Sequence, residues 1–153
     1  MKRQSGFTLI ELLLVLAIIG IISAIAIPAL LGQRARAKAK AVGSMVANIA
    51  GECARVNDTL KEAGGTVTAT TVVGSVLGLS NYNYPATKNP YGGTLTPYTS
   101  TASTVIGYVS LTPNDSYVDT ATSKSYAAVV IQGYYIDPNT NSSGSTSKVV
   151  ALD

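Results

Sequence analysis

Hydrophobic residues follow three successive patterns along the chain, and the first pattern is continuous. Nearly every residue from Phe7 to Leu31 is Leu, Ile, Val or Ala, and Glu11 is the only ionisable side chain between Arg3 and Arg34. The run holds 25 residues, which as a helix would rise about 37 Å, enough to cross a hydrocarbon layer of ~30 Å. The pattern therefore predicts a membrane-spanning helix over residues 7–31.

The second pattern places apolar residues on one face only. They recur at steps of three and four, as in a helix with one buried side, at Val42, Met45, Val46, Ile49, Cys53, Val56 and Leu60. We expect an amphipathic helix that continues the first over residues 32–62 and ends at Gly64–Gly65. Because Cys53 lies in the apolar stripe, we expect its thiol to be buried and inert.

The third pattern begins after Gly65, where β-branched residues alternate with polar ones. The ranges expected as strands are Thr66–Val73, Thr104–Leu111, Ser125–Ile136 and Val149–Leu152. Asn81–Pro97 and Asp137–Ser147 are rich in Pro, Gly, Asn and Ser, so both are predicted to be loops. An antiparallel sheet packed on the amphipathic helix would bury both apolar faces. The sequence thus predicts an α+β fold whose β-rich globular headgroup covers residues 63–153.

The distribution of charged residues along the chain distinguishes the same three regions. Charged residues make up only 12% of the 153 residues, and the net charge is +3. Residues 41–153 contain five basic and seven acidic side chains, so the headgroup is slightly acidic and a nucleic-acid surface is not indicated. Four basic residues follow the apolar run, and we call them the basic collar: Arg34, Arg36, Lys38 and Lys40. We expect the collar to lie near lipid headgroups.

The residue types present exclude most catalytic chemistry. The chain has one Cys and no His, so it can form no intrachain disulfide and no Ser–His or Cys–His nucleophilic pair. We therefore expect no enzyme activity and no cofactor. A weak calcium candidate comprises Asp137, Asn139 and Asn141, which imitate the start of a calcium loop. Ser142 and Lys148 occupy the positions where that loop requires Gly and Glu, and an Asx turn at Asp137 is the favoured alternative.

The N-terminal run has two ordinary explanations. One is a cleaved secretory signal peptide, with Ala24-Ile25-Ala26 as its cleavage pattern, although the run is longer than a typical signal sequence. The other is a plain membrane anchor. That explanation accounts for the length but not for Glu11, because an acidic group within a bilayer costs about 2.5–3.5 kcal/mol and usually has a partner.

A third explanation comes from the residues around Glu11. Gly6-Phe7-Thr8-Leu9-Ile10-Glu11, preceded by Met1-Lys2-Arg3-Gln4-Ser5, strongly resembles the N-terminus of type IV pilins and their pseudopilin relatives. Pro28 stands where that family commonly has a helix-kinking proline. The resemblance implies that residues 1–6 are a leader that a prepilin peptidase removes on the cytoplasmic side, between Gly6 and Phe7, and that Phe7 is then N-methylated. It also implies an orientation opposite to the one that a count of the collar charges favours.

The resemblance further implies a role for Glu11. Cleavage would create an α-ammonium group on Phe7, and the family's glutamate is taken to attract that group on a neighbouring subunit during assembly. In an apolar setting an unpaired partner is strongly penalised, so the pair would set the register of the polymer. Pro28 is expected to kink or locally melt the helix. The hydroxyls of Thr8 and Ser23 are expected to bond to helical carbonyls.

As a member of this family the chain would be a major pilin that polymerises with identical subunits, with the apolar helix as filament core. The precursor would lie in the cytoplasmic membrane, in contact with lipid and the inner-membrane assembly platform, and the filament would be extracellular, serving adhesion, motility or DNA uptake. The alternatives are a major pseudopilin of a type II secretion system, which would be periplasmic, a minor pilin, and a monomeric membrane-anchored binding module. Many Gram-negative major pilins close a C-terminal loop with a disulfide, which this chain cannot do, and the subtype stays open.

Overall fold

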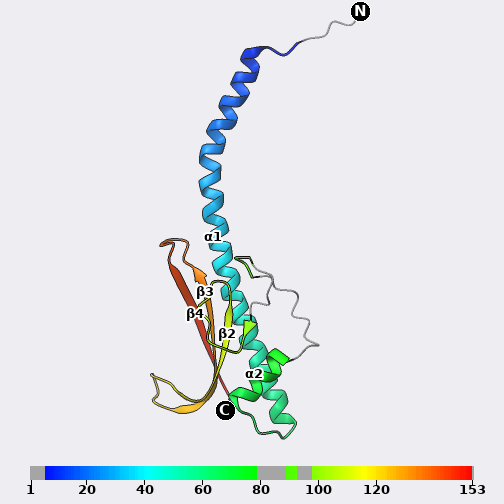
Figure 1. Ribbon diagram of the computed structural model, residues 1–153, viewed down its shortest axis with the longest axis vertical. Helices are drawn as coiled ribbons and strands as arrows, with labels where there is room; N and C mark the ends of the chain where they lie inside the picture. The colour runs from blue at the N-terminus through cyan, green and yellow to red at the C-terminus, as the bar shows by residue number, and fades with distance from the viewer. Residues whose placement is uncertain (1–5, 79–88, 93–97, 153) are drawn as a thin grey trace, which may run out of the picture. The chain divides into compact units, whose positions relative to one another are not determined.

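The computed structural model describes residues 6–78, 89–92 and 98–152. The chain divides into two units, Met1–Ala35 and Arg36–Asp153, which are considered separately. Figure 1 shows the elements of both. The second unit combines helices with a four-stranded sheet, and the expected α+β fold is confirmed.

The helix α1 runs from Leu9 to Glu62, and its first part forms the first unit. That part is long and apolar enough to cross a membrane, and none of its most apolar segment is buried. The helix passes through Pro28 without interruption, so local melting is absent from this structure, whereas a kink at Pro28 stays a prediction.

The part of α1 in the second unit is amphipathic, as predicted. Its buried face contains Val42, Met45, Val46, Ile49, Ala50, Cys53, Val56 and Asn57. The helix ends at Glu62, where Gly64 has a φ of 72° and the amide of Gly65 donates to the carbonyl of Leu60 at 3.2 Å. Glycine enters this left-handed conformation without strain, so Gly64–Gly65 ends α1 as expected.

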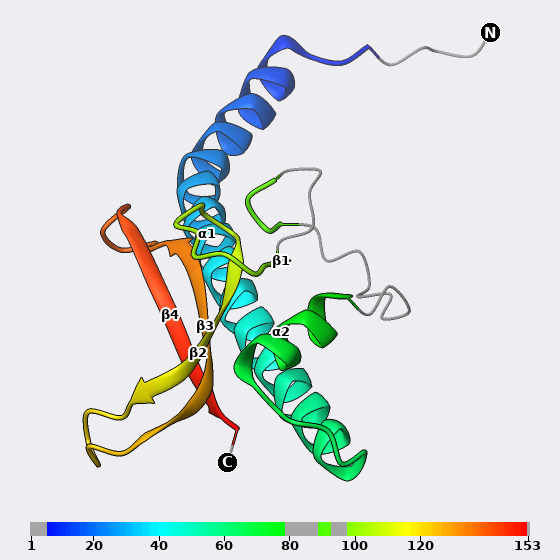
Figure 2. The same ribbon diagram turned by 60° about the horizontal axis from the view of Figure 1, so that its bottom comes forward.

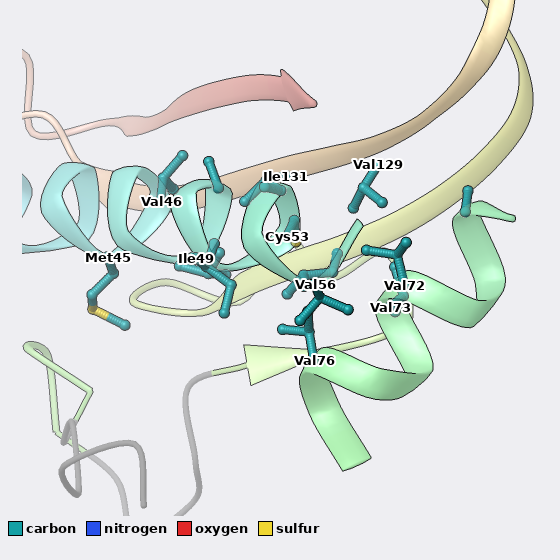
Figure 3. Packing of buried hydrophobic residues seen from close by; sticks show 14 of the residues in the cluster. Met45, Val46, Ile49, Cys53, Val56, Val72, Val73, Val76, Val129 and Ile131 are labelled. Atoms are coloured by element: carbon teal, nitrogen blue, oxygen red, sulfur yellow. The ribbon is translucent and has the colours of Figure 1, made fainter. Parts of the chain in front are cut away.

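The strand predicted at Thr66–Val73 is wrong, because this region forms the helix α2, Ala69–Gly78. Its apolar residues lie at helical spacing, and Figure 3 shows Val72, Val73 and Val76 directed toward Val56 of α1. β-branched residues favour strands only weakly, and burial against a neighbouring element overrides that preference.

The sheet has the order β1-β2-β3-β4, with β1 parallel to β2 and the other pairs antiparallel. The strands are β1 (Tyr98–Thr99), β2 (Val109–Val118), β3 (Ser125–Ile136) and β4 (Ser143–Ala151). Figure 2 shows β2, β3 and β4 side by side, with α2 beside α1. The prediction is confirmed for β3 in full.

The predictions for the other two long strands are correct only in part. β2 begins later than expected and continues to Val118, and β4 begins at Ser143, inside the predicted loop Asp137–Ser147. Both extensions are polar and lack an apolar alternation, and they are strands because each pairs with β3. Most of the predicted loop Asn81–Pro97 lies outside the described residues.

The core joins both helices to one face of the sheet, through residues such as Ile49, Val76, Leu111 and Ile131. α1 approaches β3 closely at Gly133. A Cβ atom there would lie 2.7 Å from Cγ1 of Val42 and 2.8 Å from Cγ2 of Val46. The absence of a side chain at Gly133 therefore permits this helix–sheet contact.

Candidate functional site

The N-terminal end of α1 is organised by Thr8 and Glu11. Thr8 directly precedes the first helical residue, Leu9, and Oε2 of Glu11 accepts hydrogen bonds from the Thr8 amide at 3.0 Å and from Oγ1 of Thr8 at 2.7 Å. In return, the amide of Glu11 donates to Oγ1 of Thr8 at 3.4 Å. This reciprocal pattern is a capping box, which satisfies amides that the first turn of a helix leaves without partners.

The capping box corrects the role expected for Thr8. Its hydroxyl donates to the Glu11 carboxylate and does not bond to a helical carbonyl as predicted. The spacing of Thr8 and Glu11, Thr-x-x-Glu, is a recognised start signal for a helix and is present in the sequence. The corresponding expectation for Ser23 stays a prediction.

The carboxylate of Glu11 keeps one oxygen available. Both bonds from Thr8 end on Oε2, and no hydrogen bond to Oε1 is formed within the described residues. The site is exposed in the single chain, and a negative charge in the first turn is favoured by the helix dipole. Glu11 can therefore cap its own helix while Oε1 receives a donor from another molecule.

Gly6 and Phe7 lie in a non-helical segment before the helix. Both are exposed, and the Phe7 side chain has 83% of its surface accessible. A peptide bond in such a segment can enter a protease site without unwinding a helix. Cleavage between Gly6 and Phe7 and N-methylation of Phe7 stay predictions.

The weak calcium candidate lies in the turn between β3 and β4. Oδ1 of Asp137 accepts from the amide of Asn139 at 2.8 Å, which confirms the predicted Asx turn. The Asn141 amide donates to the Asp137 carbonyl at 2.8 Å, and Asn141 has a φ of 52°. No group of three or more His, Cys, Asp or Glu side chains that could hold a metal occurs in the described parts of the chain. Calcium binding stays an untested prediction.

Cys53 is buried, as expected. Burial, with a smaller effect from the charge of Glu52, raises the pKa of its thiol to about 12. The nucleophilic form of cysteine is the thiolate, so this thiol is protonated and unreactive near neutral pH.

Comparison with known proteins agrees with the N-terminal motif. The family described as the prokaryotic N-terminal methylation motif matches residues 1–27. A type II secretion system core protein G from Aeromonas hydrophila is 45% identical over 47 residues, which cover 30% of this chain and 33% of that protein. A fimbrial protein from Moraxella nonliquefaciens is 60% identical over 38 residues, 25% of each chain. A fimbrial protein from Pseudomonas aeruginosa is 75% identical over 28 residues, 18% of each chain.

These matches cover a limited part of each protein. The chain spans about a third of the length of the secretion relative and a quarter or less of the two fimbrial proteins. No solved structure matches the chain. The resemblance noted from the sequence is confirmed, and it concerns the N-terminal segment.

Proposed function

Because this chain carries the N-terminus of the type IV pilin and pseudopilin family, we propose that it is the major structural subunit of a type IV pilus. In this proposal a prepilin peptidase cleaves the precursor between Gly6 and Phe7 at the cytoplasmic membrane, and an inner-membrane assembly platform adds the subunit to an extracellular filament. The subunit is a building block without a catalytic role. The filament serves adhesion, motility or DNA uptake.

The observation that carries the proposal is the single carboxylate of Glu11 at the start of an exposed apolar segment of α1. Sixteen large hydrophobic side chains from Phe7 to Leu31 are each 49–83% exposed. Lipid tails are as apolar as these side chains, so moving the helix from membrane to filament yields little hydrophobic free energy. A charged group in the apolar region, by contrast, gains strongly from an opposite charge.

The geometry of the capping box is suited to this pairing. Cleavage would place an ammonium group on Phe7, directly before the Thr8–Glu11 pair. Oε2 of Glu11 is held by its own Thr8, which leaves Oε1 for the Phe7 ammonium of a neighbouring subunit. A subunit docked out of register would leave one charge without a partner, so the pairing would select the correct register.

Two substitutions separate the charge of Glu11 from its capping role. Glu11→Gln retains an oxygen that can accept from Thr8 but removes the charge, whereas Thr8→Val removes the capping hydroxyl and retains the charge. We expect Glu11→Gln to lower the yield of filaments at least tenfold, because it leaves the Phe7 ammonium group of the neighbouring subunit without a partner in an apolar environment. We expect Thr8→Val to keep most of the yield. Purified filaments would be quantified, with precursor processing followed by N-terminal mass analysis.

The outcomes discriminate between the candidates. Normal filament formation by Glu11→Gln would contradict the charge-pairing mechanism. A wild-type chain that is processed but never polymerises would favour a monomeric anchored module, and a chain that begins at Ile27 would indicate a cleaved signal peptide.

The second candidate function is a major pseudopilin of a type II secretion system, and it is favoured by the match to core protein G, which extends over 47 residues. Long surface fibres composed of this chain would exclude that candidate. Thermal stability that rises with added calcium would favour it. A minor pilin would be found only at low abundance within fibres of another subunit.

A further inference from the structure

The collar residues that belong to the second unit lie on two sides of α1. Arg36 and Lys40 are exposed and lie four residues apart, so they share one side of the helix. Lys38 lies on the opposite side, since residues two apart on a helix differ by about 200°, and its Nζ lies 5.3 Å from the centroid of the Tyr91 ring. The pair Arg36 and Lys40 therefore points away from the side on which Tyr91 lies.

This basic pair has no acidic partner among the residues that the structure describes. In the described part of the chain the ion pair formed is that between Arg55 and Glu52. Glu52 is the first acidic residue of α1 after the collar, and its side chain is mostly buried, with 14% of its surface exposed. Arg36 and Lys40 are thus two cations that the described residues leave unneutralised.

A matching acidic pair lies near the C-terminal end of the same helix. Asp58 and Glu62 are exposed, lie four residues apart, and form no ion pair in the described residues. From the described residues, the Asp58 carboxylate receives one long hydrogen bond, of 3.5 Å, from Nδ2 of Asn57. The separation from Arg36 to Asp58 is 22 residues, and that from Lys40 to Glu62 is also 22 residues, or about 33 Å along the helix. If a second copy is shifted by this one distance along the helix axis, its Asp58 and Glu62 come level with Arg36 and Lys40 of the first copy.

We propose that Arg36 and Lys40 of one subunit pair with Asp58 and Glu62 of a second copy, displaced by about 33 Å along α1. The proposal rests on the proposed polymer, because copies inserted in one membrane point the same way and would meet as parallel helices. Within one chain the two charge pairs are too far apart to meet. The neighbour joined through Phe7 and Glu11 would be a different copy, displaced by about 6 Å.

The contact would add a second registration point on the headgroup-bearing half of the helix. Exposed ion pairs contribute little in a single subunit. Packing between copies removes water and strengthens each pair, and a wrong stagger would bring like charges together. The charge pattern would therefore select one axial stagger among those that the apolar segments allow.

Zero-length carbodiimide crosslinking of filaments assembled from the full mature chain tests the contact directly. We expect a Lys40–Glu62 crosslink in a covalent dimer. The two residues are about 33 Å apart in one chain, so such a crosslink must join two copies. A Lys40–Asp58 crosslink without Lys40–Glu62 would indicate antiparallel helices and would overturn the proposal.

Charge-reversal variants provide a second test of the proposed ion pairs. Lys40→Glu and Glu62→Lys should each reduce filament yield about tenfold, since attraction is replaced by repulsion, and the combined variant should recover most of the yield. Lys124→Glu, which reverses an exposed lysine outside α1, is the matched control and should assemble normally.

The failures of this inference and of the proposed function are distinguishable. A wild-type chain that forms no filament contradicts the proposed function. If wild type forms filaments and Lys40→Glu assembles equally well, only the charge pairing is overturned. If Lys40→Glu instead weakens binding to vesicles that contain phosphatidylglycerol and filaments show no Lys40–Glu62 crosslink, the pair serves lipid headgroups and the inference is wrong.

Discussion

The close contact between α1 and β3 at Gly133 makes a sharp prediction for Gly133→Ala. A Cβ atom at this position would lie 2.7 Å from Cγ1 of Val42 and 2.8 Å from Cγ2 of Val46. Both valines are essentially buried, at 0% and 3% exposure, and their branched side chains have few alternative rotamers. The helix or the strand must therefore shift to admit one methyl group.

The size of the effect follows from overpacking. Inserting a methyl group into a filled core costs about 1–3 kcal/mol of unfolding free energy. For a domain of this size each kcal/mol lowers the melting temperature by about 4 °C, so Gly133→Ala should melt about 4–12 °C below wild type. Val46→Ala in the same chain removes the contact with Cγ2 of Val46 and leaves the one with Cγ1 of Val42, so the double variant should be somewhat more stable than the sum of the two changes predicts.

The assay is thermal unfolding of the full chain in detergent, followed by far-ultraviolet circular dichroism. Gly74→Ala is the matched control, because Gly74 is an exposed residue of α2 and an added Cβ would meet nothing within 4 Å. Alanine is a better helix former than glycine, so this variant should be stabilised by about 0.5–1 kcal/mol. If Gly133→Ala melted at or above the wild-type temperature, the direct packing of α1 on β3 would be refuted.

Three further predictions concern single side chains of the second unit. Oδ1 of Asp115 accepts from the Ala69 amide at 2.8 Å at the start of α2, so Asp115→Ala should cost about 0.5–2 kcal/mol in chemical denaturation, whereas Asp115→Asn should retain most of the stability. Because burial raises the pKa of Cys53 to about 12, iodoacetamide at pH 8 should label it only after unfolding, and rapid labelling of the folded chain would contradict this. The Thr122 hydroxyl, with backbone amides, lowers the pKa of Asp119. The ionised Asp119 carboxylate therefore contributes fully to folding stability above the pKa of about 4 that it has in the unfolded chain, and this contribution is lost as the pH falls through the lower pKa of the folded state. Asp119→Asn should therefore weaken the acid dependence of the melting temperature, and an unchanged pH profile would contradict the hydrogen-bonded turn.

The N-terminal features could be predicted because each depends on neighbouring residues alone. The length of the apolar run, the isolated Glu11 and the Gly6-Phe7 motif are local properties of the sequence. The amphipathic continuation was also predictable, because its apolar residues keep helical spacing over several turns. The structure buries all of the predicted stripe except Leu60, which is partly buried. Even the overlooked capping box was present as Thr-x-x-Glu.

The remaining elements depended on residues far away in the chain. Thr66–Val73 has the composition of a strand, yet α2 forms there because its valines bury against α1 and the sheet while Asp115 of β2 caps its first turn. A register shift between Asn114 and Tyr117 accompanies this cap, and an irregularity of this kind can redirect a side chain.

The sequence by itself determined the long helix, its change from wholly apolar to one-sided, and the positions of the charges along it. Only the tertiary structure decided the helical state of α2, the limits of β2 and β4, and the requirement for a residue without a side chain at Gly133. The physical reason is the range of the interactions involved. Periodicity and capping act within a few residues, whereas strand pairing and packing join segments whose proximity is set by the fold.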